Sequence, residues 1–117
     1  MKRLSIQELD KIIKASADIN RVRILKMLKD KKMCVCEIAA VLAITQPSVS
    51  RHLKKLKDAG FIESENEGLW TNYFLCPQNP FAVTVIEKLD SWIGTDKTIT
   101  DDQKAVRKAD RGRLCCP

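Results

Sequence analysis

The segment Thr45-Gln46-Pro47-Ser48-Val49-Ser50-Arg51-His52-Leu53-Lys54-Lys55-Leu56-Lys57-Asp58-Ala59-Gly60 has the start, the periodicity and the end of a helix. The Thr45 hydroxyl can cap the first turn, and Pro47 suits that turn because its missing N–H is not needed there. Gly60 suits a helix end. Apolar side chains recur at i, i+4 and i+7 as Val49, Leu53 and Leu56. The segment therefore predicts an amphipathic helix packed on a core by one face.

The opposite face of this predicted helix carries short polar and cationic side chains. Four cations against Asp58 give the segment a charge of +3, within a chain of net charge +6 and pI near 9.2. Such side chains can reach the base edges and phosphates of DNA, although an ordinary solvated face has the same pattern. The candidate DNA contacts are Gln46, Ser48, Ser50, Arg51, His52, Lys54 and Lys55.

The residues on either side of this helix predict the fold class. A short apolar helix is expected over 35–42, and only two residues separate it from Thr45, which is typical of a helix-turn-helix. After Gly60, aromatic and β-branched residues at 61–65 and 70–75 flank a turn at 66–68 and predict a β-hairpin. The expected fold is α+β, mostly α: a winged helix-turn-helix with a two-stranded wing.

The ends of the chain add helices to this unit. A capping box at Ser5 and Glu8 begins a first helix over 5–17, and Asp18 begins a second, in which Arg21, Lys26 and Lys29 are expected to face outward. A further helix is expected over 80–93. The first helix and this last one are more apolar than a 117-residue monomer can easily bury, which favours a homodimer joined through these two helices. A dimer could also reach two DNA half-sites about 34 Å apart.

The predicted domain organisation has two parts. Residues 1–94 form the DNA-binding and dimerisation domain, and residues 95–117 form a polar tail. A capping box at Thr100 and Gln103 predicts at most a short helix in that tail. The tail ends in the vicinal pair Cys115-Cys116.

Composition limits the class of protein. No apolar run is long enough to cross a bilayer and no signal sequence is evident, so a cytoplasmic location is expected, where thiols stay reduced. Five cysteines in that compartment favour metal, metalloid or redox chemistry over structural disulfides. An enzyme is not expected, because Cys34 and Cys36 have no nearby histidine to act as a base and no glycine-rich phosphate loop is present.

Three segments together resemble the arsenical-resistance repressor (ArsR/SmtB) family over roughly residues 5–93. They are Met33-Cys34-Val35-Cys36-Glu37-Ile38-Ala39, Thr45–Leu53 and Glu67-Gly68-Leu69-Trp70. The resemblance implies a homodimeric winged-helix repressor that binds double-stranded operator DNA and releases it when a thiophilic ion binds. The implied inducer is trivalent arsenic or antimony held by cysteine thiolates, with no enzymatic cofactor and no membrane partner.

The cysteine pair suggests how binding could be coupled to DNA release. Cys34 and Cys36 are about 200° apart around an ideal helix, so one small ion could not bind both while the helix is regular. We therefore expect binding to unwind the first turn of the helix that supports the DNA-contacting one, a two-state element that both ligands can bias. The alternative is that both cysteines are small buried hydrophobes.

The chain departs from the family pattern at the third ligand. Arsenical repressors of this type often have a cysteine where this chain has Ala39. Cys115 and Cys116 could complete the Cys34/Cys36 site within or across subunits, form a site of their own with Cys76, or be an inert end. Two other functions stay open: a thiol-oxidation sensor on the same fold, and a sensor of another soft metal ion.

The predicted wing is a second departure because it is acidic. Glu63, Glu65 and Glu67 all lie in the hairpin. Phosphate contacts are therefore expected from Arg51, Lys54, Lys55 and the second helix rather than from the wing.

Overall fold

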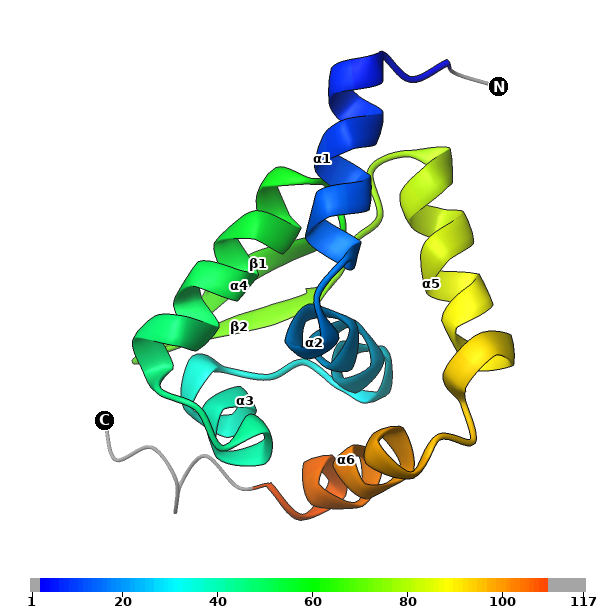
Figure 1. Cartoon of the computed structure of the whole chain (residues 1–117). Helices are drawn as coiled ribbons and strands as arrows, with labels where there is room; N and C mark the ends of the chain where they lie inside the picture. The colour runs from blue at the N-terminus through cyan, green and yellow to red at the C-terminus, as the bar shows by residue number, and fades with distance from the viewer. Residues whose placement is uncertain (1–2, 110–117) are drawn as a thin grey trace.

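The computed structural model describes residues 3–109, and Cys115 and Cys116 therefore lie outside the described residues. The elements in chain order are α1 (Ile6–Ser16), α2 (Ile19–Asp30), α3 (Val35–Leu42), α4 (Gln46–Asp58), β1 (Ile62–Glu67), β2 (Trp70–Leu75), α5 (Pro80–Ile93) and α6 (Lys97–Lys108). Figure 1 shows α2 near the centre, with the other helices and the hairpin arranged around it. The predicted winged helix-turn-helix fold is confirmed.

The helix-turn-helix consists of α3 and α4, which pack against each other. Ala43 makes the tight turn with a left-handed backbone, φ 57°. The Thr45 side chain accepts a hydrogen bond from the backbone N–H of Ser48, as predicted for the cap. Val49, Leu53 and Leu56 are all buried, which confirms the apolar stripe and leaves the other face of α4 outward.

The wing is an antiparallel pair whose register runs from Ile62 opposite Leu75 to Glu67 opposite Trp70. The turn expected at 66–68 is therefore a two-residue loop, Gly68 and Leu69, and β1 is longer than predicted. Gly68 has φ 60°, which glycine adopts at little steric cost. A second link joins the wing to the helices, because Met33 and Tyr73 exchange backbone hydrogen bonds of 3.1 and 2.8 Å.

The core forms around α2, where Ile24, Leu25 and Met27 are almost fully buried. The expectation that Arg21 and Lys26 face outward is wrong: they are only 9% and 4% exposed. Buried charges persist in proteins only when they are paired or hydrogen-bonded. These two have partners on segments far away in the sequence, described below.

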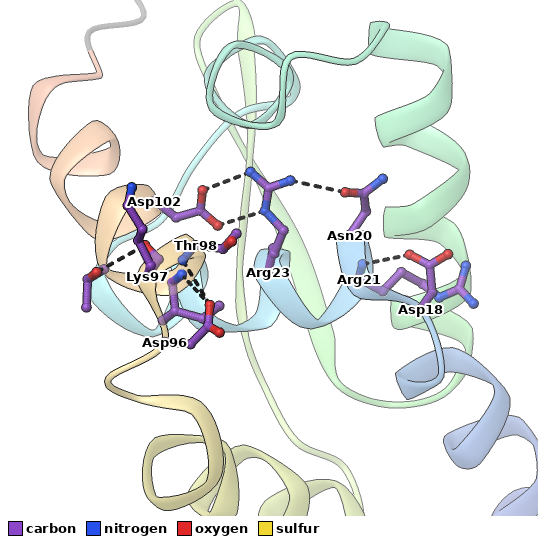
Figure 2. A network of polar contacts seen from close by, with 10 residues as sticks. Asp18, Asn20, Arg21, Arg23, Asp96, Lys97, Thr98 and Asp102 are labelled. Carbon is purple, nitrogen blue, oxygen red and sulfur yellow. Dashed lines mark hydrogen bonds and ion pairs between the residues drawn. The ribbon is translucent and has the colours of Figure 1, made fainter.

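Helix α6 is packed against other helices of the domain. It begins at Lys97, with Asp96 as its cap, instead of at the predicted Thr100 box. It packs on α2 and α3 and buries Ile99 and Val106. Figure 2 shows the polar side of this contact, where the Arg23 guanidinium donates two hydrogen bonds of 2.9 Å to the Asp102 carboxylate.

Candidate nucleic-acid interface and cysteine site

The outward face of α4 presents the predicted DNA contacts together. Gln46, Ser50 and Arg51 are exposed, and Ser48 is half-buried near the cap. The Arg51 guanidinium donates a 3.0 Å hydrogen bond to the Ser48 hydroxyl. This bond directs the Arg51 side chain along the helix N-terminus, which is the end that enters the major groove in helix-turn-helix proteins.

The lysines of α4 lie further along the same helix. Lys54 and Lys55 are exposed, and Lys54 lies 3.2 Å from Asp58 one turn away. An exposed ion pair at this spacing contributes only about 0.3–0.5 kcal/mol to stability. A DNA phosphate can therefore replace Asp58 as the partner of Lys54. Lys57 instead faces the wing, where it donates to the Ser64 hydroxyl at 3.2 Å.

His52 is held from behind by α2. The Arg21 guanidinium donates to the backbone carbonyls of Ala15 and Lys14, and its Nη1 lies 3.3 Å from Nδ1 of His52. Partial burial lowers the pKa of His52, and the cationic charge of Arg21 lowers it further. His52 is therefore a neutral imidazole at pH 7, with one ring nitrogen directed at a cation.

The cations of α2, which were predicted to contact phosphates, instead pair with carboxylates of the same chain. Lys26 and Lys29 both bind the carboxylate of Asp90 on α5. These two lysines hold the pKa of Asp90 below its usual value. With Arg23 paired to Asp102, α2 uses its cations to hold α5 and α6, so phosphate contacts from this helix are not supported.

The sequence did not indicate that α1 contributes cations near α4. Lys11 and Lys14 line a groove between α1 and α4 together with Lys55, and Asp10 and Asp58 lie in the same groove. The spacing of Lys11 and Lys14 places them on one helix face. This spacing could have predicted that the two lysines share a face of α1. It could not have predicted that this face lies beside α4, because that depends on the tertiary fold.

Lysines offset much of the acidic charge of the wing. The Glu65 carboxylate lies 2.6 Å from the Lys32 ammonium, and the Glu63 carboxylate lies 4.0 Å from the Lys57 ammonium. The Lys32 ammonium also lies 5.0 Å from the centre of the Phe74 ring. The hairpin is therefore less repulsive to a phosphate backbone than its three glutamates suggest.

Cys34 and Cys36 are close together at the start of α3. Their sulfur atoms are 3.4 Å apart while α3 remains a regular helix from Val35 onward. Cys34 is the residue before the helix and has an extended backbone, so the helical angle of about 200° does not apply to the pair. The expectation that binding must unwind the first turn of α3 therefore loses its geometric basis.

The surroundings of Cys34 restrain its ionisation. Cys34 is 3% exposed, and its backbone N–H donates a 3.0 Å hydrogen bond to the Glu37 carboxylate. Burial raises the pKa of the Cys34 thiol, and Glu37 adds to the effect as a nearby negative charge. Cys34 is therefore a protonated thiol at neutral pH, whereas Cys36 is disulfide-bonded in this structure.

The described residues do not complete a metal site. Within residues 3–109, no cluster of three or more His, Cys, Asp or Glu side chains could hold a metal ion. Cys76 lies beyond the end of β2, where the Gln78 amide donates to its sulfur at 3.1 Å. The structure therefore brings together Cys34 and Cys36 of the predicted ligands, and Cys115 and Cys116 lie outside the described part.

The fold and this surface define a class: a winged helix-turn-helix regulator of transcription. A family model described as "Bacterial regulatory protein, arsR family" matches residues 18–64. The arsenic resistance transcriptional regulator ArsR1 of Pseudomonas putida is 33% identical over 91 residues, which cover 73% of this chain and 71% of that protein. This chain belongs to the arsR family of transcriptional regulators, which are DNA-binding proteins and not enzymes.

Solved structures agree with this fold. HlyU from Vibrio cholerae has a TM-score of 0.64 and 28% sequence identity, over 74% of this chain and 91% of that one. Mb0332 from Mycobacterium bovis, a homodimeric winged helix-turn-helix domain, has a TM-score of 0.65 and 20% identity, over 83% and 94% of the two chains. Among residues 3–109, none of the helices is long and apolar enough to span a membrane.

Proposed function

We propose that this chain is a homodimeric repressor that binds operator DNA and releases it when trivalent arsenic or antimony binds Cys34 and Cys36. One observation carries the proposal: the two sulfur atoms lie 3.4 Å apart at the start of α3, the helix that supports α4. Two sulfurs held by one ion at about 2.3 Å, with angles of about 90–110°, are roughly 3.3–3.8 Å apart. The pair already has the spacing that one thiophilic ion requires.

The proposed DNA contacts follow from exposure. Gln46, Ser48, Ser50, Arg51 and His52 would face base edges, and Lys54 and Lys55 would bind phosphates. Lys14 of α1 joins them as a phosphate contact because it lines the same groove as Lys55. Specific binding should then weaken steeply with salt, as expected for contacts that release counterions.

The proposed dimer interface is the outer face of α1 and α5. These two helices pack against each other, and each leaves large apolar side chains in solvent. Ile6 is 77% exposed on α1, and Trp92 is 66% exposed on α5. Burying such side chains between two subunits would stabilise the dimer by roughly 1.5–3 kcal/mol for each one.

The raised pKa of Cys34 suits arsenite chemistry. Arsenous acid is uncharged and condenses with protonated thiols: each new As–S bond replaces an As–O bond, and the thiol proton leaves with the hydroxyl as water. No electrons are transferred. A peroxide sensor needs the thiolate instead, which burial of Cys34 disfavours. Reduction of Cys36 must precede capture of the ion, because Cys36 is disulfide-bonded in this structure.

Coupling to DNA would pass through two contacts of the cysteine segment. Met33, next to Cys34, is bonded through its backbone to Tyr73 of the wing. Helix α3, which begins at the other side of Cys34, packs on α4. A shift of Cys34 on binding an ion would therefore move the wing and α4 relative to each other, without any unwinding of α3.

The test is release of a fluorescent operator duplex, selected by the protein from a random library, measured by anisotropy under a reductant. Arsenite, antimonite, a methylated trivalent arsenical and cadmium are titrated in parallel. Cys34→Ser and Cys36→Ser should each raise the arsenite midpoint at least ten-fold, and Cys76→Ser should leave it unchanged. Unchanged release in both variants would exclude this site.

One observation favours a second candidate, the thiol-oxidation sensor: Cys36 is disulfide-bonded. For this function, peroxide in the absence of reductant should release the duplex, and a reductant should restore binding. Release by arsenite but not by peroxide supports the first candidate over the second.

A further inference from the structure

We infer that Arg21 sets the base specificity of one operator position by acting through His52: it fixes the imidazole as an N–H donor, which pairs with base edges that carry an acceptor and excludes cytosine. Arg21 is then a positioning residue, because it touches His52 and not the DNA. The inference rests on the proposed function, since it assigns a role within the proposed DNA contact of His52. It depends on DNA binding and not on the inducer.

The Arg21 side chain is held in one orientation. It lies in the first turn of α2 and is 9% exposed. Its Nε donates to the Ala15 carbonyl at 2.7 Å, and its Nη2 donates to the Lys14 carbonyl at 3.0 Å. The backbone N–H of Arg21 donates to Asp18, as Figure 2 shows. A planar guanidinium bonded at several points has little freedom to rotate, so Nη1 points at His52 in a fixed direction.

The contact with His52 is additional to what the burial of Arg21 requires. The carbonyls of Lys14 and Ala15 belong to the last turn of α1, where a helix leaves such groups without partners of its own. Two bonds to them explain why a cation is tolerated there. The third guanidinium nitrogen, Nη1, instead reaches another helix, where it lies 3.3 Å from Nδ1 of His52 on α4. This third contact points to a role beyond joining α1 to α2.

The contact determines where the imidazole carries its proton. A guanidinium has only donors, so Nδ1 must accept and the proton must be on Nε2. A ring with protons on both nitrogens would place one N–H against another. Within residues 3–109, the hydrogen-bond partner of the ring is Arg21 at Nδ1. The Nε2 proton, which lies farther from the backbone on a half-buried side chain, is left for a partner outside the described residues.

The charge of the ring favours a base as that partner over a phosphate. Burial of the ring, with the positive charges of Arg21 and Lys55, lowers the pKa of His52 despite the negative charge of Asp18. A phosphate contact would gain affinity from a charged ring, which this environment opposes. A neutral donor of fixed direction gains nothing from charge, but it can discriminate between bases.

The donor and acceptor pattern of the major groove gives the specificity. Guanine presents acceptors at N7 and O6, adenine presents one at N7, and thymine presents one at O4. Cytosine presents only its N4 amino donor. An imidazole fixed as a donor can therefore bind three of the four bases and meets cytosine donor to donor. Without Arg21 the ring can move its proton to Nδ1, and Nε2 can then accept from cytosine.

The test compares the sequences that four proteins select from a random duplex library at neutral pH: the wild type, His52→Ala, Arg21→Met and Arg107→Gln. The position read by His52 is the one whose preference His52→Ala removes. Anisotropy with the four bases at that position should show cytosine binding the wild type at least about five-fold more weakly than the best base. Arg21→Met should lose this discrimination. Arg107→Gln removes an exposed arginine of α6 and should retain it.

A merely structural role for Arg21 predicts a different result. Loss of its bonds to α1 would weaken binding to all four duplexes alike and leave their ratios unchanged, with circular dichroism reporting whether the variant is folded. Exclusion of cytosine that persists in Arg21→Met would therefore overturn the inference. A His52→Ala variant that changes no base preference would overturn it as well, because His52 would then contact a phosphate or no DNA at all.

A second measurement needs no variant at Arg21. The chain has one histidine, so nitrogen-15 spectra of the labelled wild type bound to its selected duplex report on His52 alone. The proton should be on Nε2 in the complex, and a proton on Nδ1 would overturn the inference. Selection of no duplex would refute the DNA-binding part of the proposed function. Failure of arsenite to release a selected duplex would refute the proposed inducer and leave this inference standing.

Discussion

The Arg21 guanidinium lies 3.3 Å from Nδ1 of His52, so a buried cation of α2 contacts a side chain of α4, the helix proposed to contact DNA. A guanidinium can only donate hydrogen bonds, so Nδ1 must accept and Nε2 must carry the proton. In the proposed DNA contact, His52 would therefore act as an N–H donor. Because the chain has one histidine, this tautomer can be read directly from nitrogen-15 chemical shifts of untagged, labelled protein.

The same contact predicts a pH dependence of folding. The folded protein has a lower His52 pKa than the unfolded chain, where the value is 6.5, so the unfolded chain takes up the proton first as pH falls. The free energy of unfolding should therefore decrease below about pH 6.5 and be unaffected above it. Denaturant unfolding between about pH 5 and 8 measures this. His52→Gln should flatten that part of the profile, and an unchanged profile would contradict the contact.

Arg51 and Lys54 should differ in their effect on DNA binding. Arg51→Ala should cost about 1–3 kcal/mol of binding free energy and relax base specificity, since Arg51 is proposed to contact bases. Lys54→Ala should weaken binding to all sequences alike and reduce the salt slope by about one. Lys97→Ala on α6 serves as the control. If deleting the wing abolished DNA binding while Arg51→Ala did not, α4 would not be the main DNA-contacting element.

The turn between α3 and α4 offers a stability prediction. Ala43 adopts φ 57°, a region in which a side chain is strained and glycine is not. Ala43→Gly should raise the free energy of unfolding by roughly 1 kcal/mol, measured by urea titration. Ala40→Gly, exposed within α3, should lower it by a similar amount, about 1 kcal/mol. The opposite order would show that the turn is relaxed with alanine.

The oligomeric state should depend on Trp92. Trp92→Glu places a charge on the proposed interface and should convert the dimer to monomers in light scattering, with little loss of helical signal. Leu69→Glu is the matched control, because Leu69 is also a largely exposed apolar residue but lies at the wing tip. A Trp92→Glu variant that stays dimeric at micromolar concentration would place the interface elsewhere.

The features that were predicted correctly from the sequence depend on residues close to each other in the chain. The caps at Ser5, Asp18 and Thr45 and the apolar stripe of α4 depend on residues within one or two turns of each other. Local chemistry also predicted the hairpin, although its loop is residues 68–69 instead of the expected 66–68. Such signals act before any tertiary contact forms, which is why one sequence is enough to detect them.

The errors came from partners distant in the chain and from helical geometry assumed for a residue outside a helix. Lys26 is buried because Asp90, 64 residues later, pairs with it, and Arg23 meets Asp102 across 79 residues. The hydrophobic periodicity of a single helix cannot predict ion pairs between residues so far apart in the sequence. The cysteine geometry failed because the helical angle was applied to Cys34, although α3 begins at Val35 as predicted and Cys34 has an extended backbone.

The reciprocal bonds between Met33 and Tyr73 have a consequence for engineering. They join β2 of the wing to the residue preceding Cys34, one of the two cysteines proposed to bind the inducer, so the two parts cannot be exchanged as separate modules. If Cys34 and Cys36 bind the inducer as proposed, transplanting a hairpin from a relative should change the inducer threshold as well as operator preference. A library that varies both segments together should therefore yield working sensors more often than one that varies either alone.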